Sequence, residues 1–284
     1  MFILVGIGVV IGSILVGFLI AGGNLLLLLQ WSEMIVIGGA AIGSILIASP
    51  LSLIKKIIAE IPKAISPSHY SKQDYLELLK SFNELFLLAQ RDGLLAIEKH
   101  IENPLESDIL SKNKKFVNNE MTRSFFSDTM KVMLSGGVPP HELEDLIDTE
   151  IETYEIESRP VASALSRVGD SLPGLGIVAA VLGIIVTMAS IDKGAVVVGE
   201  HVAAALVGTF LGVLMAYGFV NPLAANLEHN LENKIRLFYT IKACIVAYAK
   251  GNPPIIAIEI ARRTIFSDDR PTFSELENYV RGKA

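Results

Sequence analysis

Two apolar stretches of the chain carry small, proline and threonine side chains but no ionisable ones. Residues 171–191 and residues 202–227 contain no Asp, Glu, Lys, Arg or His. In the first stretch, helical spacing places one set of side chains on a single face: Pro173, Ala180, Ile184 and Thr187. A comparable set occupies the second stretch: Ala205, Thr209, Gly212 and Ala216. Such faces could line an ion path, or they could simply let two helices pack closely.

Ion transfer through hydrocarbon needs a group that can accept the ion, and ionisable side chains inside a membrane are the usual acceptors. Neither stretch supplies one. We therefore expect that a partner protein supplies the acid, or else that the chain conducts nothing. Thr209 has a purely structural alternative, because a threonine hydroxyl can bond back to its own helix.

The stretches that must position these residues have the length of membrane spans, since a helix needs about 20 apolar residues to cross a bilayer. Two more spans are predicted, at residues 1–21 and at about 34–48, with a short turn at residues 22–33 between them. Residues 1–21 lack the positively charged start of a signal peptide, so we favour a retained helix over a cleaved leader. Hydrophobic residues form 51% of the sequence, which indicates a membrane protein.

Charged residues of both signs concentrate between residues 55 and 167, which predicts a large water-facing insert. Apolar residues at three- and four-residue spacing predict helices at 72–90 and 120–134, and a long helix after Pro140 that Pro160 should bend. No segment alternates with period two, so we expect an all-α, polytopic membrane protein with four transmembrane helices. The predicted parts are transmembrane helices in 1–50, a cytoplasmic helical domain in 51–168, transmembrane helices in 169–227 and cytoplasmic helices in 228–284.

The distribution of Lys and Arg predicts the orientation. Residues 22–32 contain no basic side chain, and residues 192–200 contain only Lys193. The other ends of the spans are flanked by a basic set: Lys55, Lys56, Lys63, Arg159, Arg167, Lys234 and Arg236. The positive-inside rule therefore predicts that both termini and the insert are cytoplasmic. The net charge of −6, without a basic stripe, argues against nucleic acid as a partner.

Five blocks spread over nearly the whole chain carry a family resemblance. They are LAIEKHIENP (95–104), DTEIETYE (148–155), GDSLPGLGIVAAVLGIIVTM (169–188), VGTFLGVLMAYGFVNPLA (207–224) and NPPIIAIEIARRTIFSDDRP (252–271). Together they resemble the MotA family, the stator subunits of the bacterial flagellar motor. The resemblance implies a complex of five such chains around two copies of MotB in the inner membrane. It also implies that ion flow through this complex turns the rotor protein FliG, and it implies neither an enzyme nor a cofactor.

The resemblance implies that MotB supplies the missing acid, an aspartate near the inner end of its single span. Pro173, Ala180, Thr209 and Pro222 match family positions near that aspartate. Sodium-driven relatives carry threonine seven residues after the third-span proline, where this chain has Ala180, so we expect protons as the coupling ion. The two prolines could act as hinges, although a proline in a membrane helix can also mark only a kink.

The resemblance implies a rotor contact made by four charged residues of the insert, three that match family positions and one that lies beside such a position. Glu98, Asp128 and Glu150 match acidic positions. The family's arginine position falls on Gln90, so the adjacent Arg91 is expected to serve, from a slightly rotated direction. From the residues alone, a solvated helix face is the favoured interpretation of each charge.

Three other functions compete with this one. The first is an energising subunit of the ExbB or TolQ kind, against which the four spans and the IENP and IARRT blocks speak. The second is an intramembrane enzyme, which would need a nucleophile–base pair or a metal cluster, and the spans hold no His or Asp to provide one. The third is a passive membrane scaffold without transport.

Overall fold

The computed structural model describes residues 2–65 and 69–282, and within these ranges it is helical, with no strand. The predicted all-α class is confirmed. The described residues form two compact units, each assembled from two separate parts of the chain. The first unit comprises Met1–Ser68 and Ser158–Asn230, and the second comprises His69–Glu157 and Leu231–Ala284.

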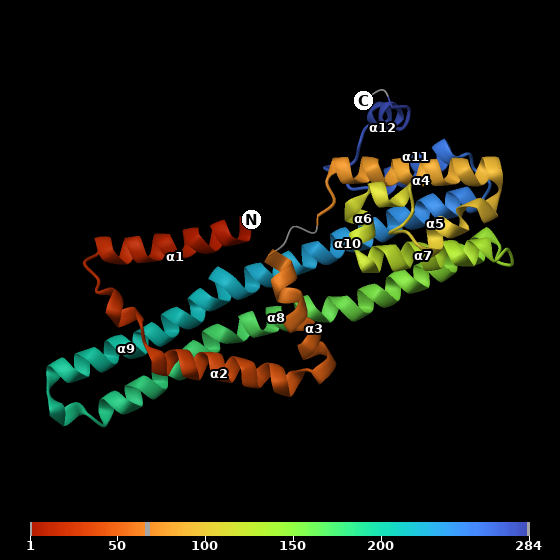
Figure 1. The fold of residues 1–284 in the computed structure, drawn as a ribbon. Coiled ribbons are helices and arrows are strands. Elements are labelled where there is room, and N and C mark those ends of the chain that lie inside the picture. The colour runs from red at the N-terminus through yellow and green to blue at the C-terminus, as the bar shows by residue number, and fades with distance from the viewer. Residues whose placement is uncertain (1, 66–68, 283–284) are drawn as a thin grey trace. The chain divides into compact units, whose positions relative to one another are not determined.

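The first unit contains the apolar helices (Figure 1). Its elements are α1 (Phe2–Ile20), the 3₁₀ turn η1 (Leu25–Leu28), α2 (Trp31–Ala48), α3 (Leu51–Ile65), the later part of α8 (Pro140–Met188), η4 (Ile191–Lys193), α9 (Ala195–Leu214), the π-helix η5 (Met215–Val220) and the start of α10 (Asn221–Ala249). Four segments of the described chain are long and apolar enough to cross a membrane: Ile3–Ile20, Leu25–Ala48 and parts of Pro140–Met188 and Ala195–Ala249. The four predicted spans are therefore confirmed.

The second span differs from its predicted boundaries. The sequence predicts a turn over residues 22–33, but α2 already begins at Trp31 and takes Glu33 into its first turn. Before it, η1 is closed by Asn24, whose side chain accepts a hydrogen bond from the backbone N–H of Leu26. An acid in the first turn interacts favourably with the positive end of the helix dipole, which is one reason for the earlier start.

The predicted long helix is confirmed as α8, which runs unbroken from Pro140 to Met188 with Pro160 and Pro173 inside it. It contributes residues to both compact units. The fourth span holds a feature that the sequence did not indicate, because η5 interrupts the α-helical pattern between α9 and α10. This π-helix directly precedes α10, whose second residue, Pro222, has no backbone N–H to donate.

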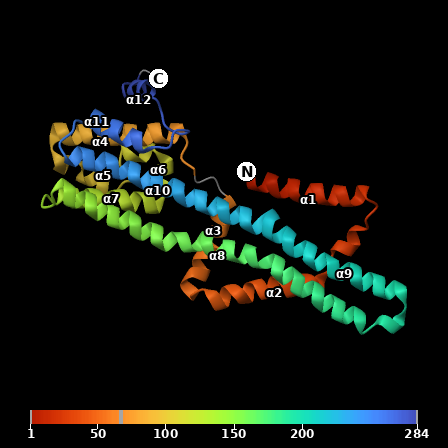
Figure 2. The same ribbon diagram turned by 180° about the vertical axis from the view of Figure 1, so that it is seen from behind.

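Figure 2 shows the helices of the second unit from behind. These helices pack around a buried core that is rich in aromatic side chains. The elements of the unit are α4 (Lys72–Asp92), η2 (Leu94–Ile97), α5 (Glu98–Glu102), η3 (Leu110–Lys112), α6 (Lys114–Asn118), α7 (Glu120–Leu134), the early part of α8, the later part of α10, α11 (Pro254–Thr264) and α12 (Phe273–Val280). Phe82 stacks on Phe126 with ring centroids 4.8 Å apart, and both are fully buried. Phe86 stacks on Tyr248 at 4.1 Å, which joins α4 to α10.

Candidate functional site

Glycines bring α8 and α9 into backbone contact within the first unit. A methyl group added to Gly212 would lie 2.6 Å from the carbonyl oxygen of Leu172, and one on Gly176 would lie 2.8 Å from that of Gly208. A methyl group on Gly183 would meet the Cβ of Ala205 at 2.9 Å. No side chain larger than hydrogen fits at these points, so the two spans form one closely packed pair, as small residues allow in lipid.

Several predicted pathway residues lie in this α8–α9 contact. Thr187 is 3% exposed, and its hydroxyl donates a hydrogen bond to the carbonyl of Gly183 at 2.8 Å, so it is engaged within its own helix. Ala205, Gly212 and Ala216 are buried. Their burial agrees with the second interpretation of these small side chains, in which they let two helices pack closely rather than line an ion path.

The remaining pathway residues lie nearer to the surface of the single chain. Pro173, Ala180 and Thr209 are half-buried, and Pro222 is exposed. Thr209 lies beside α8, because a methyl group on Gly176 would come within 3.3 Å of its Cα. These residues therefore remain able to face a neighbouring chain.

A polar contact that the sequence did not reveal joins the two proline-bearing spans. The side-chain amide of Asn221 donates a hydrogen bond to Oδ1 of Asp170 at 3.0 Å. Asn221 sits so close to α8 that a methyl group on Gly169 would lie 1.8 Å from its Oδ1. The pair stands three residues before Pro173 and one before Pro222. The only signal in the sequence is that each polar residue lies within three positions of a proline.

The most informative residue missed by the sequence reasoning is Glu33. Its side chain is 6% exposed, and its Oε2 has no hydrogen-bond partner among the described residues. Ile37 and Ala41, one and two turns further along α2, are buried on the same face. That four-residue spacing is the signal in the sequence, but a turn predicted over residues 22–33 leaves Glu33 outside the helix.

The predicted rotor-contact residues all lie in the second unit, and all four are exposed. Arg91, at the end of α4, pairs with its neighbour Asp92 through Nε–Oδ1 at 2.9 Å and Nη2–Oδ2 at 2.8 Å. Glu98 is the first residue of α5, beyond Gly93. At φ +90° Gly93 adopts a backbone conformation that other residues rarely take, so it ends α4 sharply.

The structure brings Asp128 and Glu150 close together from α7 and α8. Partial desolvation, and then the negative charge of Asp128, raise the pKa of the Glu150 carboxyl above its ordinary value. Asp128 also lies 3.6 Å from the ammonium of Lys131. Among the four predicted charges, Asp128 and Glu150 thus form an acidic pair.

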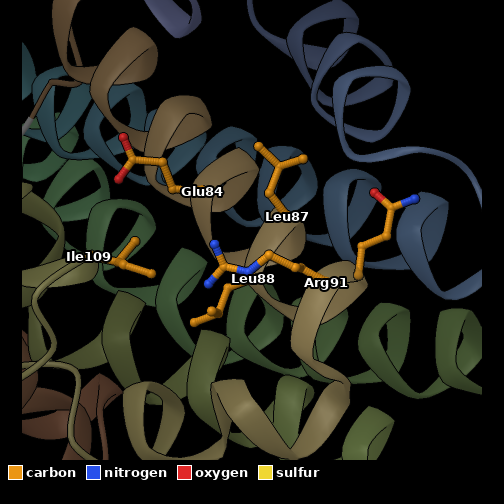
Figure 3. Close-up of a pocket in the computed structure, with 6 residues that line it drawn as sticks. Glu84, Leu87, Leu88, Arg91 and Ile109 are labelled. Atoms are coloured by element: carbon orange, nitrogen blue, oxygen red, sulfur yellow. The ribbon is translucent and has the colours of Figure 1, made fainter.

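A surface hollow of about 540 Å³ lies beside the arginine (Figure 3). Its lining residues are Glu84, Leu87, Leu88, Gln90, Arg91 and Ile109. Figure 3 shows the side chain of Arg91 extending toward Leu88, with Ile109 beyond its guanidinium. Apolar walls beside an exposed guanidinium provide both contact area and charge.

The described residues contain no group of three or more His, Cys, Asp or Glu that could hold a metal ion. An all-helical fold, four candidate spans and a glycine-built contact between two of them define a multi-pass membrane protein.

Comparison with known proteins identifies the family. Residues 4–93 match the model "Motility protein A N-terminal", and residues 117–239 match the model "MotA/TolQ/ExbB proton channel family". The chain is 39% identical to Motility protein A of Salmonella typhimurium and 38% identical to that of Escherichia coli, in each case over 99% of this chain and 95% of the relative. It therefore belongs to the motility protein A family of the MotA/TolQ/ExbB group. The predicted family is confirmed, and with it a stator and channel subunit of the inner membrane rather than an enzyme.

The fold agrees with this assignment. The structure of C. jejuni MotAB superimposes with a TM-score of 0.80 at 22% identity, over 95% of this chain and 98% of that one. The ExbB and TolQ alternative is not favoured, because the similarity to the two motility proteins extends over nearly their whole length.

Proposed function

We propose that this stator subunit works with a MotB-type partner and couples proton flow to torque on the rotor protein FliG. The observation that carries the proposal is the full-length similarity to motility protein A. The C. jejuni structure of the same fold is a MotAB complex, which supports a partner of that type here. The proposed assembly has five copies of the chain around two partner chains, with both termini in the cytoplasm.

The proposed coupling ion is the proton. A sodium ion needs several oxygen ligands, and Ala180 offers no side-chain oxygen beside Thr209. A proton needs only an acceptor and a chain of water molecules. The proposed acceptor is the partner's aspartate, because residues 171–191 and 202–227 contain no acid.

Pro173 and Pro222 are the proposed hinges that respond to protonation of that aspartate. Each lacks an N–H, so each leaves one backbone carbonyl of its helix without its usual donor. The π-helix before Pro222 and the hydrogen bond between Asn221 and Asp170 support this proposal. π-helical turns are frequent where helices change shape in function.

The proposed rotor contact uses Arg91, Glu98, Asp128 and Glu150. Their exposure leaves them accessible, and exposed charges guide association and fix its register while adding little affinity. This balance suits a contact that is made and broken repeatedly. The hollow next to Arg91 would take an apolar side chain of the rotor.

Complementation in a strain that lacks only this gene and its partner gene tests the function. The chain and partner together should restore swimming in soft agar, whereas the chain alone should reach the membrane without restoring it. A partner whose membrane aspartate is changed to asparagine is the matched control and should not restore swimming. Absence of rotation with both intact chains at normal membrane level would contradict the proposal.

A further inference from the structure

Glu33 is the one ionisable side chain that the sequence places within residues 2–48. The structure buries it: its 6% exposure compares with 0% for Ile37 and 7% for Ala41 on the same face of α2. Ile37 and Ala41 belong to a cluster that includes Leu172 and Ala179 of α8. Glu33 therefore stands at the outer end of the face that α2 turns toward the α8–α9 pair.

Small residues make the space that the carboxylate occupies. A methyl group on Gly208 of α9 would lie 2.6 Å from Oε2 of Glu33. The same position is flanked at 3.3 Å by the Cβ of Ala179 and at 3.3 Å by the backbone nitrogen of Ala180. The carboxylate thus reaches the point where three helices meet, in a recess that only glycine at 208 leaves open.

Helix stability alone does not account for this placement. An acid in the first turn of a helix stabilises it without being buried, by about 0.3–1 kcal/mol at an exposed site. Here Oε2 is buried with no hydrogen-bond partner among the described residues. A buried, unpaired carboxylate costs free energy, and ionisable groups at membrane depth are by default functional.

The recess lies beside the predicted ion path. Ala180 borders it directly, and Thr209 follows Gly208 in the chain. Gly208 precedes Pro222 by fourteen residues. At 1.5 Å per helical residue, this places the carboxylate about 20 Å outward from the proline that marks the inner end of the span.

We propose that Glu33 is a proton-holding site of the chain itself, on the outer side of the path to the partner's aspartate. This inference rests on the proposed function and adds a second acid to it. Oε2 takes a proton from a hydronium ion on the outer side, forming an O–H bond and leaving a water molecule. That bond breaks when the proton passes to water leading inward, and the carboxylate is regenerated.

No other charge competes for this role on the helices packed against it. α8 has no ionisable side chain from Ser171 to its end at Met188, α9 has none beyond His201, and η1 has none. The nearest along the chain are Asp192 and Lys193 before α9, and Glu200 and His201 in its early part.

Single-stator rotation measurements with three variants test the proposal: E33Q, E33D and, as the matched control, S32A, which changes the exposed neighbour on the same turn. A group that only passes protons on toward the partner's aspartate determines how fast they arrive. It does not change the free energy that each proton releases, which is about 2.3 kcal/mol per 100 mV. E33Q should therefore lower the low-load speed per stator by about threefold or more, because the transfer group is lost. The stall torque per stator of E33Q should stay near that of the unaltered chain. S32A should equal the unaltered chain in both low-load speed and stall torque.

The order of the two Glu33 variants separates proton transfer from packing. Glutamine keeps the volume of glutamate but cannot hold the proton in this way, whereas aspartate keeps the acid and leaves a gap. Proton transfer predicts that E33D rotates faster than E33Q at low load; a packing role predicts the reverse order. An unchanged low-load speed in E33Q, or the reverse order, would overturn the proposal, while a motionless unaltered chain would instead count against the proposed function.

Discussion

Glu98 stands at the first position of α5, exposed and directly after the short turn η2. An acid at the start of a helix is favoured by the helix dipole, but that effect is worth only a fraction of a kcal/mol at an exposed site. Replacing it should therefore leave the fold intact. The residue is thus suited to a test of contact rather than of stability.

We expect E98K to lower stall torque by about half or more, because a reversed charge opposes the register of an electrostatic contact. Membrane level should be unchanged. Rotation of tethered cells, with immunoblots of the membrane fraction, measures both. Glu106, an exposed acid in the same region, provides the control variant E106K, which should rotate normally. Normal torque in E98K at normal level would remove Glu98 from the rotor contact.

For individual residues, sequence patterns predict which charged side chains are exposed better than they predict which side chains lie next to one another. The exposure of Arg91, Glu98, Asp128 and Glu150 follows from their polar positions on amphipathic helices. The pairing of Asn221 with Asp170, and the burial of Glu33, depend on which helix faces meet in three dimensions. Periodicity along the sequence does not show which helix faces meet, and the four-residue spacing that links Glu33 to Ile37 and Ala41 can be recognised only if α2 begins at Trp31 rather than at residue 34.

Among the elements, the helices with regular apolar spacing were predicted closely, because that spacing reflects a single buried face. The π-helix Met215–Val220 was not, since its composition is that of an ordinary span. The short helix α6 was also missed, because its start depends on a local cap, in which Asn113 accepts a hydrogen bond from the N–H of Phe116. Both misses arise where local geometry, rather than periodicity, sets the structure.

Substitution of Pro173 tests whether bending of α8 is needed for rotation. P173A restores one backbone donor to α8, which adds about 1 kcal/mol of helix stability. We nevertheless expect motility to fall sharply, because a straighter, stiffer α8 would no longer change its bend when the partner's acid is protonated. Soft-agar swimming and tethered-cell rotation measure the loss.

The alanine variant has a matched comparison in P160A, which removes the other proline inside the same helix. P160A should keep more rotation than P173A, because Pro160 lies thirteen residues before Pro173 and so further from the proposed position of the partner's aspartate. Near-normal rotation of P173A at normal membrane level would mean that Pro173 is only a packing kink.

For the whole molecule, the identity of the coupling ion determines which ion gradient powers swimming. We expect swimming speed to persist in sodium-free buffer and to collapse on addition of a protonophore, because Ala180 removes an oxygen that a sodium site would need. Video tracking of swimming cells in matched sodium and potassium buffers measures this. Loss of swimming on sodium removal alone would reverse the assignment.

The discontinuity of the second unit has a consequence for how the protein is made. Its core joins Phe82 and Phe126, from before the third span, to Ile241 and Ile258, from after the fourth. The ribosome must therefore complete both of these spans before the core can close. At about 5–20 residues per second, the 73 residues between the two halves (158–230) take about 4–15 s to synthesise. During that interval the apolar side chains in the first part of the second unit, Phe82 and Phe126 among them, remain exposed to water. Delayed membrane insertion would therefore leave this part of the nascent chain open to aggregation and proteolysis.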